Sequence, residues 1–279
     1  MPSEPSTRTA GLAERAVIQV QGGQATATRD YLAEEVPVAI HYNGEPHAVM
    51  MASPGDLDDF AYGFSLSEHG IGVHEIAQVQ REDGLEGIRL DIRTHGPLPA
   101  SLQNQLQRSL PGRSGCGICG HRLLEEIIKQ PPPVGAGPRI DAQALHRALA
   151  ELQTRQPLNA ASGALHAAAW ALADGRLLAV REDVGRHNAL DKLIGALARA
   201  QMDRGEGFAV VTSRASYEMV SKAAIAGMPL LLAISAPTAL AVDLANSCGL
   251  TLVGFVRPGR HVIYSHAWRM PDVGGAVQA

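Results

Sequence analysis

The chain has 279 residues, of which 46% are hydrophobic and 19% charged, and its formal net charge is −4. This composition is typical of a globular protein with one large domain or two smaller ones. The negative charge argues against nucleic-acid binding, because neutralising phosphates takes a surplus of lysine and arginine. The acidic N-terminal segment is unlike a signal peptide, and the longest apolar run, residues 228–241, contains two prolines. We therefore expect no membrane segment and a cytoplasmic location.

The N-terminal half predicts a disordered tail over residues 1–15, followed by a smaller α+β region over residues 16–138. Residues 36–51 are expected to form a hairpin that turns at Asn43-Gly44, and Asp56 is expected to cap a helix that reaches Leu66. Three further short elements are expected at residues 88–92 (strand), 102–110 (helix) and 121–129 (helix). The proline- and glycine-rich stretch 131–138 predicts the linker that closes this region.

Residues 139–270 alternate apolar strands with helices, ahead of a short tail over residues 271–279. Asp141 is expected to cap the first helix, and Asp174-Gly175 to close a hairpin. The later elements are expected at residues 188–201 (helix), 208–212 (strand), 217–226 (helix), 230–234 (strand), 240–248 (helix) and 250–256 (strand). This alternation predicts a three-layer α/β domain with a partly parallel sheet.

Two of the three cysteines, Cys116 and Cys119, lie in a glycine-rich loop over residues 111–120. Glycine permits tight turns and mobility but supplies no packing, so a cysteine held there is expected to react or to bind a metal. Arg113 and His121 lie nearby, and a predicted helix begins just after Cys119. Both features favour the thiolate form of these cysteines.

Three interpretations of the cysteine pair compete. A zinc site normally needs four ligands, and the sequence has no second cysteine or histidine pair at metal spacing, so we expect no metal. A thioredoxin-like redox site would follow the first strand of a βαβ unit, which this loop does not. A nucleophile on a mobile arm that carries a group between partners is the interpretation that remains. Cys248, by contrast, is expected to be a small core residue near the end of an apolar helix.

Charged and hydroxyl residues follow several predicted strands, where α/β sheets commonly bind ligands. Arg186 and His187 precede a helix whose N-terminus could receive an anion, and Ser213-Arg214 has the same arrangement. A simpler interpretation makes the first of these segments a solvated helix turn with Asp191 and Lys192 as surface charges. Residues 255–260 place two arginines around a Pro-Gly turn, which suits phosphate binding but also an ordinary exposed turn. Together these strand ends predict a pocket for a phosphorylated ligand. For His166, the sequence leaves a core role and a functional role open.

Four segments in order, GCGICG, REDVGRHNALDKLIG, SRASYEMVSKAAIAG and SAPTALAV, resemble the formate dehydrogenase accessory sulfurtransferase (FdhD) family over about residues 35–264. The resemblance implies a cytidine-deaminase-like fold for the second half and a homodimer. It also implies a function: Cys116 takes sulfur as a persulfide from a cysteine desulfurase, with help from Cys119. The sulfur then passes to the molybdenum cofactor of formate dehydrogenase, a bis-molybdopterin guanine dinucleotide.

By the same resemblance, the cofactor-binding stretch of the family matches Phe255, Val256, Arg257, Pro258, Gly259 and Arg260. With the strand-end residues, the expected cofactor-binding set also includes Arg186, His187, Ser213 and Arg214.

Three other functions remain for comparison. Zinc deaminases use His-X-Glu and Pro-Cys-X-X-Cys motifs, but here the helix begins His187-Asn188-Ala189 and the cysteine pair lies upstream, so deamination is disfavoured. A chaperone that binds the cofactor without sulfur chemistry would need Arg257 and Arg260 but not the cysteines. A thiol–disulfide oxidoreductase would need both cysteines equally.

Overall fold

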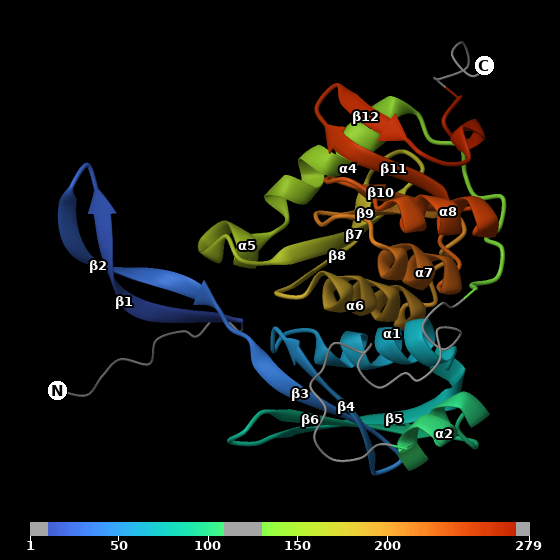
Figure 1. Cartoon of the computed structure of the whole chain (residues 1–279), viewed down its shortest axis with the longest axis horizontal. Coiled ribbons are helices and arrows are strands. Elements are labelled where there is room, and N and C mark those ends of the chain that lie inside the picture. Colours follow the sequence, from blue (N-terminus) through green and yellow to red (C-terminus); the bar gives the residue numbers. More distant parts are fainter. Residues whose placement is uncertain (1–10, 109–129, 272–279) are drawn as a thin grey trace.

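The computed structural model describes residues 11–108 and 130–271 of the chain. These residues form a two-stranded ribbon, a four-stranded sheet and a six-stranded sheet (Figure 1). The mixture of sheets and covering helices confirms the predicted α/β class. Within the two described ranges, no helix is both long enough and apolar enough to span a membrane.

The ribbon consists of β1 (Leu12–Gln21) and β2 (Gln24–Ala33), which pair antiparallel along their full length. Gly22 and Gly23 join them with φ values of 59° and 82°, a left-handed conformation that glycine adopts without strain. The ribbon reaches away from the rest of the molecule (Figure 1). Because β1 begins at Leu12, the prediction of a disordered tail over residues 1–15 is wrong for residues 12–15, which belong to a strand.

The four-stranded sheet has the order β4-β3-β6-β5. Its strands are β3 (Val36–Tyr42), β4 (Glu45–Ala52), β5 (Ile76–Asp83) and β6 (Ile88–Thr94). Its helices are α1 (Leu57–His69), α2 (Ala100–Arg108) and the 3-10 turn η1 (Val73–Glu75). Phe60 and Phe64 of α1 are buried in one core cluster with Val38 and Ile40 of β3. This apolar contact holds α1 on the sheet.

Two details of this region test local predictions. The turn at Asn43-Gly44 is confirmed, since both residues have positive φ between β3 and β4. Asp56 does occupy the N-cap position of α1, but its φ of 53° is left-handed and its side chain makes no capping bond. Its carboxylate instead lies 3.6 Å from the guanidinium of Arg181. The prediction of a side-chain cap is therefore wrong.

The six-stranded sheet has the order β12-β11-β10-β9-β7-β8. Its strands are β7 (His166–Leu172), β8 (Leu177–Asp183), β9 (Gly207–Val211), β10 (Leu230–Ala233), β11 (Thr251–Arg257) and β12 (Arg260–Ile263). The helices are α4 (Ala142–Thr154), α5 (Pro157–Ser162), α6 (Arg186–Arg199), α7 (Tyr217–Ile225), α8 (Ala239–Cys248) and the 3-10 turn η2 (Ala267–Arg269). Asp141 caps α4 as predicted, because its carboxylate accepts a bond of 2.5 Å from the Ala144 N–H.

Two apolar clusters cover the two faces of this sheet. One joins the sheet to α6, α7 and α8, and the other joins it to α4. The predicted three layers are thus present. Residues 131–138 form no helix or strand, but Arg269 donates to the carbonyls of Gly135 and Ala136 and so binds this linker to the second domain.

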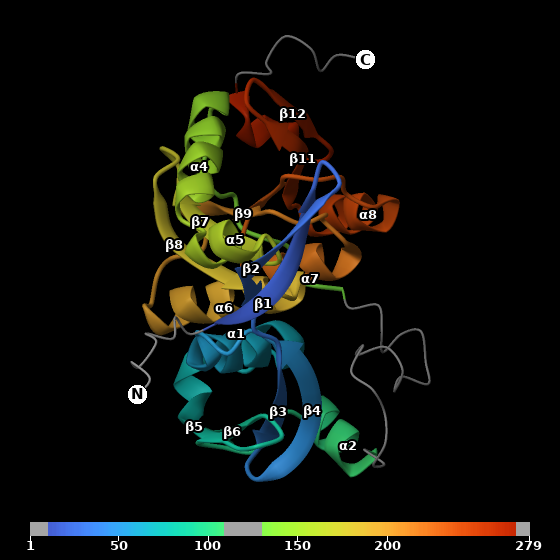
Figure 2. The ribbon, with the colours of Figure 1, turned by 90° about the vertical axis from the view of Figure 1, so that its left-hand side faces the viewer.

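Helices α1 and α6 pack against each other and join the two sheets (Figure 2). Gly63 of α1 and Gly195 of α6 permit this approach. A Cβ atom at either glycine would overlap with the backbone of the opposite helix. The contact therefore depends on these two small residues, and it places the start of α6 beside the N-terminal region.

Candidate functional site

Four strands of the six-stranded sheet end at one edge. β8 and β9 both pair antiparallel with β7, so they share a direction, and β10 and β11 continue parallel to β9. Ligands bind open α/β sheets at the carboxyl ends of such strands. We call this border the carboxyl edge. It holds every sequence-predicted cofactor-binding residue: Arg186, His187, Ser213, Arg214, Phe255, Val256, Arg257, Pro258, Gly259 and Arg260.

The loops after β9 and β10 are tied together at this edge. The Ala215 N–H donates to the Ala236 carbonyl at 3.2 Å, and the Thr238 N–H donates to the Ala215 carbonyl at 3.0 Å. Ser213 is buried and its hydroxyl donates to the Arg214 carbonyl at 2.9 Å, whereas Arg214 itself is exposed. Ser213 therefore shapes the loop, and Arg214 is the residue of the pair that can reach a ligand.

The end of β11 presents an aromatic ring and two arginines. Phe255 is 40% exposed and has a left-handed φ of 51°, and its N–H donates to the Ser235 carbonyl at 3.1 Å. The Arg257 guanidinium donates to the carbonyls of Ile234 and Val256, which ties β11 to β10. Arg260 is exposed across the Pro-Gly turn. Phe255 and Arg260 can thus contact a ligand, while Arg257 also has a structural role.

The start of α6 gathers a second group of side chains. His187 Nε2 lies 2.7 Å from Glu218 Oε2, and this contact lowers the pKa of the Glu218 carboxyl. Partial burial lowers the pKa of His166, and so do the nearby charges of Arg186 and His187. His166 is only half-buried, at the start of β7 and therefore at the carboxyl edge. The structure places it beside the predicted ligand residues rather than in the core.

Two buried donors at this edge have no hydrogen-bond partner among the described residues. They are Nε of Arg186 and Oγ of Ser216. Buried polar atoms are normally paired, so unpaired donors here suit an anionic ligand such as a phosphate. The edge from β8 to β11 spans four strand spacings, about 19 Å. The two unpaired donors follow β8 and β9, and Arg260 follows β11, so this edge offers donors along its length to a ligand with several phosphates.

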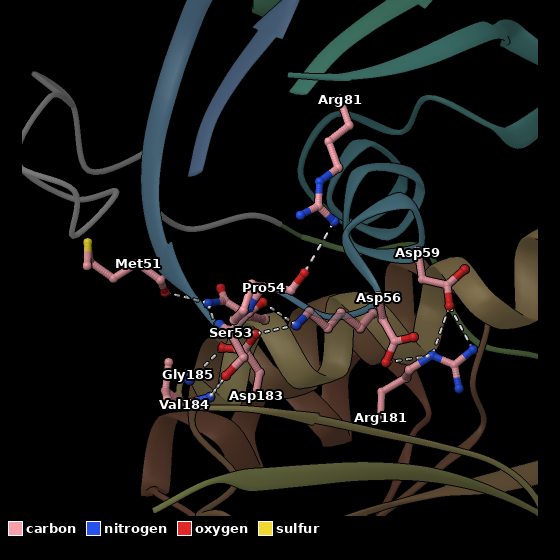
Figure 3. Close-up of polar contacts among 12 residues, drawn as sticks. Met51, Ser53, Pro54, Asp56, Asp59, Arg81, Arg181, Asp183, Val184 and Gly185 are labelled. Carbon is pink, nitrogen blue, oxygen red and sulfur yellow. Dashed lines mark hydrogen bonds and ion pairs between the residues drawn. The ribbon is translucent and has the colours of Figure 1, made fainter. Parts of the chain in front are cut away.

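The fully buried carboxylate of Asp183 fixes the segment that carries Arg186 and His187 (Figure 3). The sequence did not predict this role. Asp183 Oδ1 accepts bonds from the Gly185 N–H at 2.8 Å and the Asn188 amide at 3.1 Å. Its Oδ2 accepts the Ser53 N–H at 3.0 Å and lies 2.6 Å from Lys192 Nζ. One side chain thus joins the end of β8, the first turn of α6 and the loop after β4.

The interpretation of Asp191 and Lys192 as surface charges is wrong. Asp191 is 1% exposed and Lys192 is 0% exposed. Asp191 pairs with Lys222 of α7 at 2.9 Å, and Lys192 also donates to the Ser53 carbonyl at 2.9 Å. Both are buried because α1 covers this face of α6. A signal was present in the sequence, since Asp191 and Lys192 lie between apolar residues in NALDKLIG, and Lys222 lies in the mostly apolar segment VSKAAIAG.

A second ionic cluster links β8 to the N-terminal region through Arg181, two residues before Asp183. Arg181 of β8 lies 2.7 Å from the carboxylate of Asp59 in α1 (Figure 3). Arg199 of α6 binds the other oxygen of the same carboxylate. Asp59 is 5% exposed. The carboxyl end of β8 is thereby held against the N-terminal region by two separate charged contacts.

The cysteine predictions divide into two groups. Cys116 and Cys119 lie outside the described residues, so their proposed roles stay predictions. Cys248 is 2% exposed at the end of α8, and burial raises the pKa of its thiol. Its prediction as a core residue is confirmed.

Comparison with known proteins identifies the family. The model of the FdhD/NarQ family matches residues 33–271. The sulfur carrier protein FdhD of Xanthomonas campestris pv. campestris is 55% identical over 280 residues, covering 99% of both chains. The protein of that name from Variovorax paradoxus is 50% identical over 253 residues, covering 90% of each.

Among solved structures, a putative formate dehydrogenase accessory protein from Desulfotalea psychrophila has the same fold, with a TM-score of 0.73 at 23% identity. The match covers 93% of this chain and 99% of that one. With the sequence relatives, it leads to one conclusion: the chain belongs to the FdhD/NarQ family.

Proposed function

We propose that this protein is a sulfur carrier for formate dehydrogenase. In this proposal Cys116 accepts sulfur as a persulfide from a cysteine desulfurase and passes it to the bis-molybdopterin guanine dinucleotide cofactor. The protein works as a homodimer in the cytoplasm, where thiols stay reduced. Support comes from the 55% identity over 99% of the chain to a protein named sulfur carrier. From the structure, the observation that carries the proposal is the set of donors along the carboxyl edge, above all the unpaired Arg186 Nε and Ser216 Oγ.

Loading is a thiolate exchange. The Cys116 thiolate attacks the terminal sulfur of the donor's persulfide, the donor's sulfur–sulfur bond breaks, and the donor keeps a thiolate. Delivery as sulfide takes up two electrons. Cys119 can supply them by closing a disulfide with Cys116 as the terminal sulfur leaves, which assigns the second cysteine a role in release rather than in loading.

The described residues bind and orient the cofactor in this proposal. Arg186, Arg214 and Arg260 offer guanidinium donors to its phosphates, and the exposed ring of Phe255 offers a stacking surface for a base. His187, which contacts Glu218, lies at the N-terminus of α6. The positive end of the helix dipole there adds to the positive charge of the arginines. Asp183 holds these groups in place.

The test is intact mass spectrometry of the purified protein after incubation with a cysteine desulfurase and cysteine. We expect a sulfur-sized mass gain that a reductant removes, and we expect its absence in Cys116→Ala. Cys248→Ala is the matched control and should load like the unaltered protein, because Cys248 is buried. Loading of Cys116→Ala, or no loading of the unaltered protein under conditions that load a known acceptor, would refute the proposal.

A second candidate function is a cofactor-binding chaperone without sulfur chemistry. The same donor-lined edge favours it, because none of those donors depends on the cysteines. Equilibrium binding of guanosine diphosphate to Arg214→Ala and Cys116→Ala, combined with their persulfide loading, separates the two functions. A sulfur carrier loses loading only in Cys116→Ala and binding only in Arg214→Ala. A chaperone shows no loading in either variant or in the unaltered protein.

A further inference from the structure

The β1–β2 ribbon has one apolar and one polar face. Its ten register pairs run without a bulge, and directly paired residues share a face. Eight of the ten residues on one face are apolar: Leu12, Ala16, Ile18, Val20, Ala25, Ala27, Tyr31 and Ala33. Only three of ten are apolar on the other: Ala13, Val17 and Leu32. Strands that face water on both sides have no reason for this segregation, so the first face, which we call the apolar ribbon face, is built to be covered.

Nothing in the described chain covers that face. Ile18 is 73% exposed, Val20 67% and Tyr31 51%. The ribbon touches the body at its base, where Glu34 accepts a bond from the Gly11 N–H and β2 contacts α5. Beyond the base it projects away from both sheets (Figure 1), toward the viewer in Figure 2. A two-stranded hairpin is at best marginally stable alone in water, so a ribbon of this length needs a partner surface.

We propose that the apolar ribbon face packs against a second copy of this chain, in a reciprocal contact in which each protomer gives its ribbon and receives the other. This inference rests on the homodimer of the proposed function and names the element that forms it. A ribbon of two ten-residue strands covers about 330 Å² on one face. Stable interfaces bury about 800 Å² per partner, so one ribbon alone is too small.

Reciprocity is what favours a second copy over another protein. Each protomer then contributes its own ribbon face and the surface under the partner's ribbon, roughly 660 Å² in all, which approaches the size of a stable interface. A partner without such a ribbon would supply only half of this. A two-fold axis produces the exchange without further elements, because the same two patches meet twice.

The test compares two double variants of the full chain. Ile18→Glu/Val20→Glu places two charges on the apolar ribbon face. Gln19→Glu/Gln21→Glu adds the same charges to the same strand, one residue away, on the polar face. Sedimentation velocity measures the monomer–dimer equilibrium of each. We expect the first variant to dimerise about 100-fold more weakly than the unaltered protein, because two buried charges replace apolar contacts at the interface, and the second to dimerise normally.

Circular dichroism confirms that both variants fold, and the substituted side chains are exposed in the protomer, so folding is not at risk. If both variants dimerise as the unaltered protein does, the ribbon is not the contact, and the proposed homodimer stands on another surface. If the unaltered protein is a monomer, the ribbon proposal and the homodimer both fail. Persulfide loading on Cys116 is measured separately by mass and is independent of either result.

Discussion

Removal of the cation from the buried Asp183–Lys192 pair tests the arrangement that holds the site. Lys192→Met keeps the length and apolar stem of the side chain but leaves the carboxylate of Asp183 without its countercharge, both groups being 0% exposed. Breaking a buried pair from one side costs about 3–5 kcal/mol, a large fraction of the roughly 5–15 kcal/mol by which native domains are stable. Asp183 retains three hydrogen bonds, from Ser53, Gly185 and Asn188, which soften the loss. We therefore expect a cost near the lower limit, about 3 kcal/mol.

Urea unfolding followed by circular dichroism measures this change as a shift in midpoint. Arg176→Met is the matched control, because Arg176 and Asp174 are 2.7 Å apart but exposed, at 70% and 53%. Exposed pairs contribute little, so this variant should unfold like the unaltered protein. A double variant, Asp183→Asn/Lys192→Met, should be more stable than Lys192→Met, because it removes the unpaired charge.

Two results would refute the reasoning. One is a midpoint for Lys192→Met that matches the control. The other is a double variant whose loss of stability equals the sum of the losses of Lys192→Met and of Asp183→Asn, each measured alone, which would mean that the two charges do not interact. If Lys192→Met loses guanosine diphosphate binding at a temperature where the variant is still folded, the Asp183–Lys192 pair also positions the start of α6.

Further predictions concern the helix contact and a half-buried histidine. Gly195→Ala should destabilise the protein by about 2 kcal/mol in thermal unfolding, since overpacking against the Asp59 backbone outweighs the better helix propensity of alanine. Gly55→Ala, where a Cβ meets no atom within 4 Å, should have little effect, and equal losses in both variants would contradict the steric argument. Burial lowers the pKa of His47 from 6.5 to about 4, so the folded state holds its imidazole neutral. The stability this provides is complete above pH 6.5 and is lost as the pH falls through 4. His47→Phe should make the free energy of unfolding depend less on pH between 6.5 and 4, as measured by urea unfolding at several pH values. An NMR titration midpoint of His47 near 6.5 would refute the assignment.

Local sequence patterns determined much of the fold. The turn at Asn43-Gly44, the cap at Asp141 and the alternating strands and helices after it depend on neighbouring residues, and all are present. The grouping of the predicted ligand residues also followed from sequence. Parallel strands place their carboxyl ends at one edge, so residues after successive strands meet there whatever the details of packing.

Contacts between distant segments decided the rest. The sequence indicated charges at Asp191 and Lys192, but their burial depends on α1, whose residues lie more than a hundred positions earlier. The ribbon was missed because its strands are rich in alanine and also contain glutamate and aspartate, residue types that are depleted in strands. Residue type specifies what a side chain can do with its neighbours. Whether a charge faces water or a partner is set by which surface folds over it, and only the tertiary structure contains that surface.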